Sequence, residues 1–203
     1  MLQLALDLVD KRRALKLAKS CAPYFDIIEA GTPLIKSCGI RVVRDLKRIG
    51  LPVAADLKTF DAGRLEAEVA CREGADYVTV LALASDYTLG GFIDACRSYS
   101  AKSIADLMRS PIRRAYELER MGIDFLAVHS GVDEQKVGAT PFQALRRLSS
   151  RVSKPLVVAG GIGPNNIRLA KPYASIIVVG SAVTSSKDPV ESARLLRRRY
   201  QEI

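Results

Sequence analysis

The sequence lacks tryptophan, has a single histidine among its 203 residues, and contains no long apolar run. A transmembrane helix needs about 20 consecutive apolar residues, so we expect no membrane-spanning segment and no membrane partner. Met1 leads directly into an apolar, strand-like segment, without the features of a secretory signal peptide. These absences predict a cytoplasmic protein.

Cysteine is also scarce, and its placement excludes two further kinds of site. The four cysteines form no CxxC pair and lie within or at the end of helical patterns. This spacing indicates neither a zinc site nor a disulfide framework. We expect buried free thiols at Cys21, Cys38, Cys71 and Cys96.

Positive charge exceeds negative charge by nine, which would attract polyanions. The densest cluster lies near the C-terminus at Arg194, Arg197, Arg198 and Arg199. We interpret it as a solvated helix face, because cations are favourable near a helix C-terminus. The alternative, a barrel that binds nucleic acid or another polyanion, predicts salt-sensitive binding.

Eight short β-rich segments alternate with helical patterns along the chain. Near-continuous apolar strands of this kind are typical of a parallel sheet covered by helices, and eight units fit one (β/α)8 TIM barrel over residues 1–203. A doubly wound open sheet is the alternative. The expected strands are 2–7, 25–31, 52–58, 76–82, 102–108, 124–131, 155–161 and 175–181, and the expected helices are 11–21, 34–48, 64–73, 88–98, 112–121, 142–152, 165–170 and 190–202.

Polar residues occupy one parity of these strands near their C-terminal ends. Residues two apart on a strand share a face, and the inward face at the C-terminal mouth of a barrel forms the active site. A strand-end aspartate can cap a helix, and a lone histidine can be a core residue, but several buried charges together require partners or a ligand. The group comprises Asp7, Glu29, Asp56, Lys58, Asp106 and His129.

The segment Asp-x-Lys-x-x-Asp suggests particular chemistry at this mouth. Lys58, flanked by Asp56 and Asp61, would stay protonated and could donate a hydrogen bond or a proton to a developing oxyanion. Glu29 and Asp56 could bind Mg²⁺, which uses one or two carboxylates and completes its shell with water and substrate oxygens. The metal would polarise a carbonyl group and a neighbouring hydroxyl group.

Glycines follow the last two predicted strands, in "VVAGGIGPNN" and "VVGSAVT". Gly160, Gly161 and Gly180 could expose backbone N–H groups to a phosphate at the position where barrels commonly bind one. The alternative is a pair of tight turns. A phosphorylated substrate is expected.

Motifs along the whole chain resemble one enzyme family. In order they are "LALD", "IIEAGTPLIKSCG", "AADLKTFDAG", "GADYVTVLA", "VHSGVDEQKVG", "VAGGI" and "VVGSAVT". They are similar to those of the orotidine 5′-phosphate decarboxylase suprafamily, and within it to the hexulose-phosphate synthase branch. The resemblance implies an aldol reaction that depends on Mg²⁺, with Mn²⁺ as a substitute, between formaldehyde and D-ribulose 5-phosphate.

The resemblance also implies roles for individual residues. Glu29 and Asp56 would hold the metal, and Lys58 would stabilise an enediolate or handle a proton. His129 would be the general acid or base. The second acid of the Asp-x-Lys-x-x-Asp motif, Asp61, would reach the neighbouring subunit's site in a homodimer.

Substrate binding is implied at the rim and at the glycine motifs. Asp7 and Asp106 would orient substrate hydroxyl groups. The rival branch, 3-keto-L-gulonate 6-phosphate decarboxylase, carries arginines where this chain has Val132 and Ser181. Their absence favours the synthase branch and leaves phosphate binding more dependent on backbone N–H groups, such as those of the three glycines. Ser181 is also expected to bind the substrate. A catalytically idle phosphosugar-binding barrel is a further alternative.

Overall fold

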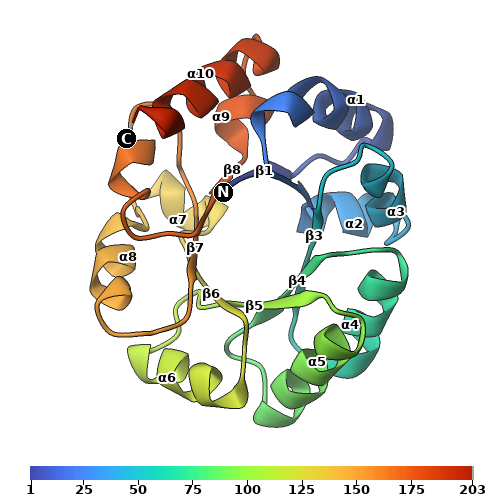
Figure 1. Ribbon diagram of the computed structural model, residues 1–203, viewed down its shortest axis with the longest axis vertical. Helices are drawn as coiled ribbons and strands as arrows, with labels where there is room; N and C mark the ends of the chain where they lie inside the picture. Colours follow the sequence, from blue (N-terminus) through green and yellow to red (C-terminus); the bar gives the residue numbers. More distant parts are fainter. Residues whose placement is uncertain (203) are drawn as a thin grey trace.

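The structure, a computed structural model, describes residues 1–202 and contains a closed barrel of eight parallel strands (Figure 1). Every strand overlaps its predicted segment, and the predicted TIM barrel is confirmed. The predicted domain extends to residue 203, which lies outside the described residues. The strands are β1 (Leu2–Leu6), β2 (Ile27–Ala30), β3 (Val53–Thr59), β4 (Tyr77–Leu81), β5 (Lys102–Asp106), β6 (Phe125–His129), β7 (Leu156–Ala159) and β8 (Ile176–Val179).

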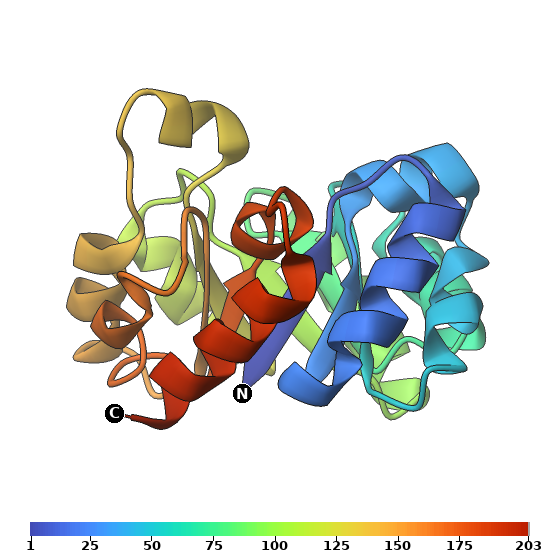
Figure 2. The ribbon, with the colours of Figure 1, turned by 90° about the horizontal axis from the view of Figure 1, so that it is seen from above.

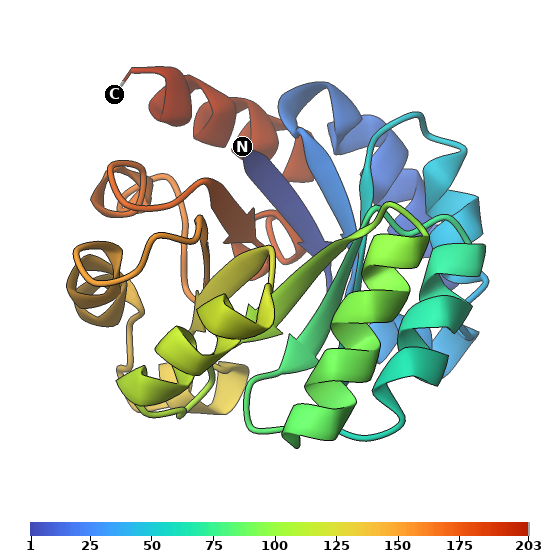
Figure 3. The same ribbon diagram turned by 60° about the horizontal axis from the view of Figure 1, so that its bottom comes forward.

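Helices surround the strands on the outside of the barrel (Figures 1 and 3). Most coincide with predicted helical segments. In chain order they are α1 (Lys11–Cys21), η1 (Ala22–Tyr24), α2 (Thr32–Cys38), α3 (Val42–Lys47), α4 (Gly63–Arg72), α5 (Asp86–Ser98), α6 (Ile112–Met121), α7 (Val132–Lys136), α8 (Phe142–Ser149), η2 (Ile167–Leu169), α9 (Ser181–Thr184) and α10 (Pro189–Gln201), where η marks a 3-10 helix.

Two helix predictions were wrong. The helix expected over 34–48 is divided into α2 and α3, because Gly39 has a left-handed φ of 78° that a continuous helix cannot contain. The helix expected over 165–170 is only the three-residue η2, since Pro172 follows closely and cannot continue a helix. The short helices α7 and α9 were not predicted; α7 projects beyond the C-terminal ends of the strands (Figure 2).

Inward and outward strand positions form separate apolar clusters, as the alternation of side chains requires. The inner cluster fills the barrel, whereas the outer cluster lies between strands and helices. The inward parity predicted for the first, second, third, fifth and sixth strands is confirmed. The inner cluster contains Ala5, Ile27, Ala54, Ile104, Ala127, Val157, Ile176 and Val178.

Three aspartates repeat one contact at the N-terminal end of the barrel. Each precedes an even-numbered strand and accepts a hydrogen bond from a backbone N–H at the start of the preceding strand. The contact satisfies donors that no strand ladder reaches and ties neighbouring strands together. The pairs are Asp26 with Leu2 at 2.7 Å, Asp76 with Val53 at 2.6 Å and Asp124 with Ser103 at 3.0 Å.

Removal of one such aspartate should destabilise the barrel. Asp124 also accepts a hydrogen bond from the Ser103 hydroxyl, at 3.0 Å. Burial would raise the pKa of Asp124, but the hydrogen bonds from Ser103 and Lys102 outweigh it and lower the pKa. We predict that Asp124→Ala lowers the free energy of unfolding at pH 7 by about 1–3 kcal/mol, as measured by chemical denaturation.

The pH dependence of this difference has a definite sign. A carboxyl group whose pKa is lower in the folded state stabilises the fold above its ordinary pKa of about 4, and this stabilisation is lost as the pH falls through the folded value. The difference between wild type and Asp124→Ala should therefore shrink in acid. Asp133→Ala, at an exposed position on α7, is the control and should leave the denaturation midpoint unchanged. Equal effects of both substitutions would contradict the prediction.

Candidate active site

The C-terminal ends of the strands bring the predicted rim residues to one end of the barrel, and four of the six form one network of hydrogen bonds and ion pairs: Asp56, Lys58, Asp106 and His129. Glu29, Asp56 and Asp106 are buried, while Lys58 and His129 are partly buried. The sixth, Asp7, is more exposed. It lies beside Gly31, where an added Cβ would be 2.2 Å from an Asp7 carboxylate oxygen.

Asp56 is the most heavily hydrogen-bonded carboxylate of the rim. Its side chain accepts hydrogen bonds from the Thr79 hydroxyl at 2.7 Å, the Thr32 hydroxyl at 2.8 Å and the Lys58 ammonium at 2.5 Å. Burial would raise the pKa of Asp56, but the charge of Lys58 and these hydrogen bonds lower it. Asp56 is therefore ionised at neutral pH.

Lys58 lies between two buried carboxylates. Its Nζ is 2.5 Å from Asp56 and 3.7 Å from Asp106. Burial would lower the pKa of Lys58. The charges of Asp56 and Asp106 outweigh this effect and raise the pKa above its usual value, so the side chain is a cation. The sequence predicted Asp56 and Asp61 as the acids beside Lys58. Asp56 is confirmed, but within one chain the second carboxylate is Asp106 on β5 rather than Asp61.

An irregular backbone places the Lys58 side chain. The register between β3 and β4 shifts between Ala55 and Thr59, and Lys58 has a left-handed φ of 48°. Its backbone N–H donates a hydrogen bond at 3.0 Å to the side-chain hydroxyl of Thr79 on β4. Thr79 therefore holds both the carboxylate of Asp56 and the backbone of Lys58.

Glu29 lies in an environment that resists its negative charge. Burial and the charges of Asp56 and Asp7 raise its pKa to about 8. The Gln3 side-chain amide donates a hydrogen bond to Glu29, and the Gln3 side-chain oxygen has no partner within residues 1–202. The pKa of Asp7 is raised as well, because neighbouring protein groups desolvate its carboxyl group and because the negative charge of Asp56 lies nearby.

Two buried acids of the rim, Glu29 and Asp56, are the residues that could contribute to a site for a divalent cation. No group of three or more His, Cys, Asp or Glu side chains suited to a metal occurs among the described residues. A site here would have two protein carboxylates, Glu29 and Asp56, and Mg²⁺ is commonly bound through one or two carboxylates together with water and substrate oxygens. Glu29 and Asp56 are buried carboxylates whose mutual repulsion a cation would relieve.

Asp106 forms a hydrogen bond with His129, the single histidine of the sequence. His129 Nδ1 lies 2.9 Å from Asp106 Oδ2, and the Met108 backbone N–H donates to Oδ1 at 3.1 Å. A carboxylate oxygen can only accept a hydrogen bond, so the donor in this pair is Nδ1–H, and Nε2 is the ring nitrogen that could exchange a proton with a substrate. The two oxygens of Asp106 thus already have protein partners, whereas the sequence assigned this residue to substrate hydroxyl groups.

The glycine motifs lie at the same end of the barrel. Gly160 and Gly161 follow β7 with left-handed φ values of 107° and 65°. Gly180 and Ser181 follow β8, and an added Cβ on Gly180 would lie 3.7 Å from the Asp7 carboxylate. The loop after β7 also approaches α9, so both segments border the rim.

Asp61 lies apart from the rim network. Its side chain is exposed and accepts a hydrogen bond at 2.7 Å from the backbone of Ala62, the next residue. Within one chain it joins none of the hydrogen bonds of Asp56, Lys58 or His129.

Thr32 and Thr79 are the site residues that sequence reasoning missed. Thr79 lies two residues after Tyr77, which packs against the inner cluster, so strand parity could have identified it. No comparable signal marks Thr32, whose position depends on how α2 begins above β3. Its hydroxyl also donates to the Asp56 backbone carbonyl at 2.7 Å.

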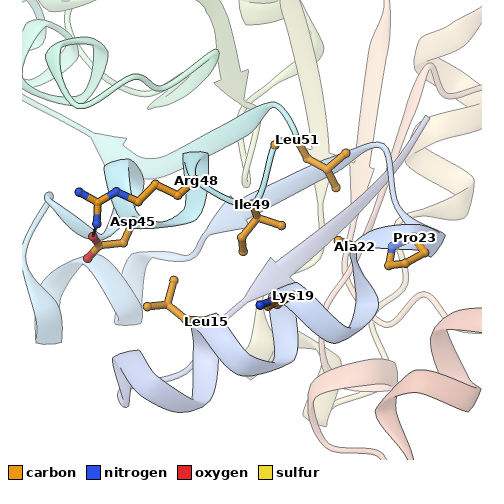
Figure 4. A pocket seen from close by; sticks show the side chains of 9 residues that line it. Leu15, Lys19, Ala22, Pro23, Asp45, Arg48, Ile49 and Leu51 are labelled. Atoms are coloured by element: carbon orange, nitrogen blue, oxygen red, sulfur yellow. Dashed lines mark hydrogen bonds and ion pairs between the residues drawn. The ribbon is translucent and has the colours of Figure 1, made fainter.

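A cavity of about 610 Å³ lies at the opposite end of the barrel (Figure 4). Its lining comes from the end of α1 and from the segment that leads into β3, including Lys19, Arg48 and Leu51. Strands begin rather than end there, and the acid network is absent from its lining. We therefore place the candidate active site at the rim.

Other expectations concern charge, cysteines and membranes. The clustered arginines near the C-terminus each lie within 4.0 Å of a carboxylate, as in a solvated helix face. All four cysteines are free, although Cys38 is partly exposed rather than buried. Within residues 1–202, none of the helices has the length and apolarity to span a bilayer.

Comparisons with known proteins agree over nearly the whole chain. The model of the orotidine 5′-phosphate decarboxylase / HUMPS family matches residues 1–196. The 3-hexulose-6-phosphate synthase of Mycobacterium gastri is 38% identical over 201 residues, covering 97% of both chains. The enzyme of that name from Staphylococcus haemolyticus is 36% identical over 202 residues, covering 97% of this chain and 96% of the relative.

A solved structure gives the same result at the level of the fold. A crystal structure of 3-hexulose-6-phosphate synthase is 37% identical, covers 98% of both chains and superposes with a TM-score of 0.93. The chain is therefore an enzyme that belongs to the orotidine 5′-phosphate decarboxylase / HUMPS family.

Proposed function

We propose that the protein is an aldehyde-lyase that adds formaldehyde to D-ribulose 5-phosphate, giving D-arabino-hex-3-ulose 6-phosphate, and that catalyses the reverse reaction. One observation carries the proposal: His129, held by Asp106, shares the rim with a cationic Lys58 that also contacts Asp106. The relatives named 3-hexulose-6-phosphate synthase support it.

The proposed reaction requires a base next to a ketose carbonyl group. His129 Nε2 would accept a proton from C1 of the sugar, which leaves an enediolate. The C1 carbon of this enediolate would then attack formaldehyde. The proton would then return to the oxygen of the former aldehyde. Lys58 would stabilise the negative charge that develops on the enediolate oxygens.

Glu29 and Asp56 would hold the divalent cation in this proposal, Mg²⁺ or Mn²⁺ in its place. When bound, the cation would supply positive charge to the carbonyl and hydroxyl oxygens of the sugar. Thr32 and Thr79 would keep the Asp56 carboxylate in one orientation through the hydrogen bonds described above.

The glycine segments would bind the phosphate group of the sugar. Gly160, Gly161 and Gly180 lack a side chain that would cover their backbone N–H groups, and Ser181 adds a hydroxyl group. The two segments approach each other closely, since an added Cβ on Gly163 would lie 3.5 Å from Ala182 Cβ. Phosphate binding there would place the sugar across the barrel mouth.

We also propose a homodimer in which Asp61 completes the partner's site. Phe60, next to Asp61, is 60% exposed, and Tyr87, on the neighbouring α5, is 97% exposed. Leu65 on α4 and Leu83 before α5 add exposed apolar surface near them. Apolar surface gathered in this way is typical of a protein interface.

The proposed activity can be tested directly. Purified protein with Mg²⁺ and ribulose 5-phosphate should consume formaldehyde, and EDTA should stop the consumption. With 3-keto-L-gulonate 6-phosphate in place of these substrates, we expect no release of CO₂. Failure to consume formaldehyde with any divalent metal would refute the synthase proposal, and rapid CO₂ release would support the rival branch.

Substitution of rim residues should remove activity without unfolding the protein. We predict that His129→Ala lowers kcat by about 10²–10⁴-fold, the range for loss of a general acid or base. Asp56→Ala, which removes a proposed ligand of the cation, should also lose most of the activity. Arg198→Ala, on the exposed part of α10, is the control and should retain wild-type kcat. Circular dichroism would check folding, and unchanged turnover in a folded rim variant would refute the assigned role.

Mixed dimers should reveal a shared site. We predict that Asp61→Ala and His129→Ala are each inactive alone. After unfolding and refolding of an equal mixture, half of the dimers would be mixed, and each mixed dimer would contain one complete site. About a quarter of wild-type activity should therefore return. No recovery despite mixed dimers seen by native mass spectrometry would contradict a role for Asp61 across the interface.

A further inference from the structure

Gln135 is a polar residue near the rim to which the proposed reaction assigns no role. It lies on α7, which begins three residues after His129 and projects beyond the C-terminal ends of the strands (Figure 2). Its neighbours Asp133 and Lys136 are exposed and pair with each other at 2.8 Å. Gln135 is partly buried, so its side chain lies against the barrel instead of in solvent.

The side-chain amide of Gln135 contacts the ends of two neighbouring strands. Its Nε2 donates a hydrogen bond at 2.8 Å to the backbone carbonyl of Ser130, a buried residue that directly follows His129 at the end of β6. Its Oε1 lies next to Gly161, since an added Cβ on Gly161 would be 3.5 Å from this oxygen. One side chain therefore lies between the backbone beside His129 and the glycine segment after β7.

Ser130 also contacts the glycine segment through its own backbone. Its N–H donates a hydrogen bond at 3.2 Å to the carbonyl of Ala159, the last residue of β7. An added Cβ on Gly160 would collide with the Ser130 carbonyl oxygen, the same atom that accepts the hydrogen bond from Gln135. In such close packing, a displacement of one segment would move the other.

We propose that Gln135 is a positioning residue, which fixes the end of β6 relative to the glycine segment so that His129 and the phosphate-binding N–H groups act on the same sugar molecule. The proposal rests on the proposed function, because it uses the roles assigned there to His129, Gly160 and Gly161. Gln135 acts through Ser130 and Gly161 and does not touch the reacting atoms. Such positioning matters because a misplacement of about 1 Å can lower a rate by about 10²-fold.

The chemistry of the amide group distinguishes glutamine from similar side chains at this position. An amide has both a donor and an acceptor, and the donor is the group that binds the Ser130 carbonyl. Methionine has a similar length but no N–H. A glutamate carboxylate could not donate to Ser130 and would add negative charge beside the proposed phosphate site. Gln135→Met and Gln135→Glu should therefore differ in their effects on phosphate binding.

Proton NMR provides the test, because the sequence has a single histidine and His129 therefore gives the only histidine ring signals of a protein purified without a histidine tag. The protein is titrated with inorganic phosphate in EDTA, and the His129 signal should move in the wild type and give a Kd. Gln135→Met should move the signal before phosphate is added and raise the Kd roughly 2–10-fold, as for loss of one hydrogen bond. Gln135→Glu should raise the Kd further.

Lys136→Met, on the exposed side of α7, is the matched control and should leave the signal and the Kd unchanged. Circular dichroism would check that each variant is folded. The proposal would be overturned by a wild-type signal that does not respond to phosphate, by a change in only one of the two quantities in Gln135→Met, or by wild-type phosphate affinity in Gln135→Glu.

Steady-state kinetics separate this proposal from the proposed function. With ribulose 5-phosphate and formaldehyde, Gln135→Met should raise KM and lower kcat, because both phosphate binding and the position of His129 change. Unchanged KM and kcat in this variant of an active enzyme would count against a positioning role. A wild-type protein that consumes no formaldehyde but gives the expected NMR results would refute the synthase activity and support the connection between His129 and the phosphate site.

Discussion

The contact of Lys58 with two buried carboxylates is the interaction on which the rim depends. Asp56 on β3 and Asp106 on β5 both lie out of solvent, and Lys58 is the cation between them. Two buried negative charges without a cation would be costly. The left-handed backbone of Lys58 is itself unfavourable, by about 1–3 kcal/mol for a residue of this kind. The ion pairs and the hydrogen bond to Thr79 favour that conformation.

The closed barrel makes this arrangement possible. Parallel strands in a fixed register bring the ends of β2, β3, β5 and β6 to one rim, although these strands are far apart in the chain. At the opposite end, aspartates tie neighbouring strands together through backbone N–H groups. The N-terminal end of the barrel therefore stabilises the strand register, and the C-terminal end holds the charged side chains that this register brings together.

The sequence predicted the fold and the membership of the rim well, because both follow from short-range patterns. Apolar runs define the strands, and strand parity places Asp56 and Asp106 on the same inner face. The second carboxylate beside Lys58, Asp106, could not be predicted, because the contact depends on a register shift in β3 and on a strand distant in sequence. Gly39, with its left-handed φ, divides into two helices the segment 34–48 that was predicted to be one. The role of Asp61 across an interface stays a prediction, since it depends on a second chain.

The central claim is that the rim converts ribulose 5-phosphate into an enediolate with His129 as the base. Proton NMR in D₂O tests it most directly, with enzyme, Mg²⁺ and ribulose 5-phosphate but no formaldehyde. We expect the wild-type enzyme to exchange one hydrogen at C1 for deuterium, and we expect His129→Ala to lose this exchange. Absence of exchange in the wild type, or equal exchange in the variant, would contradict the claim.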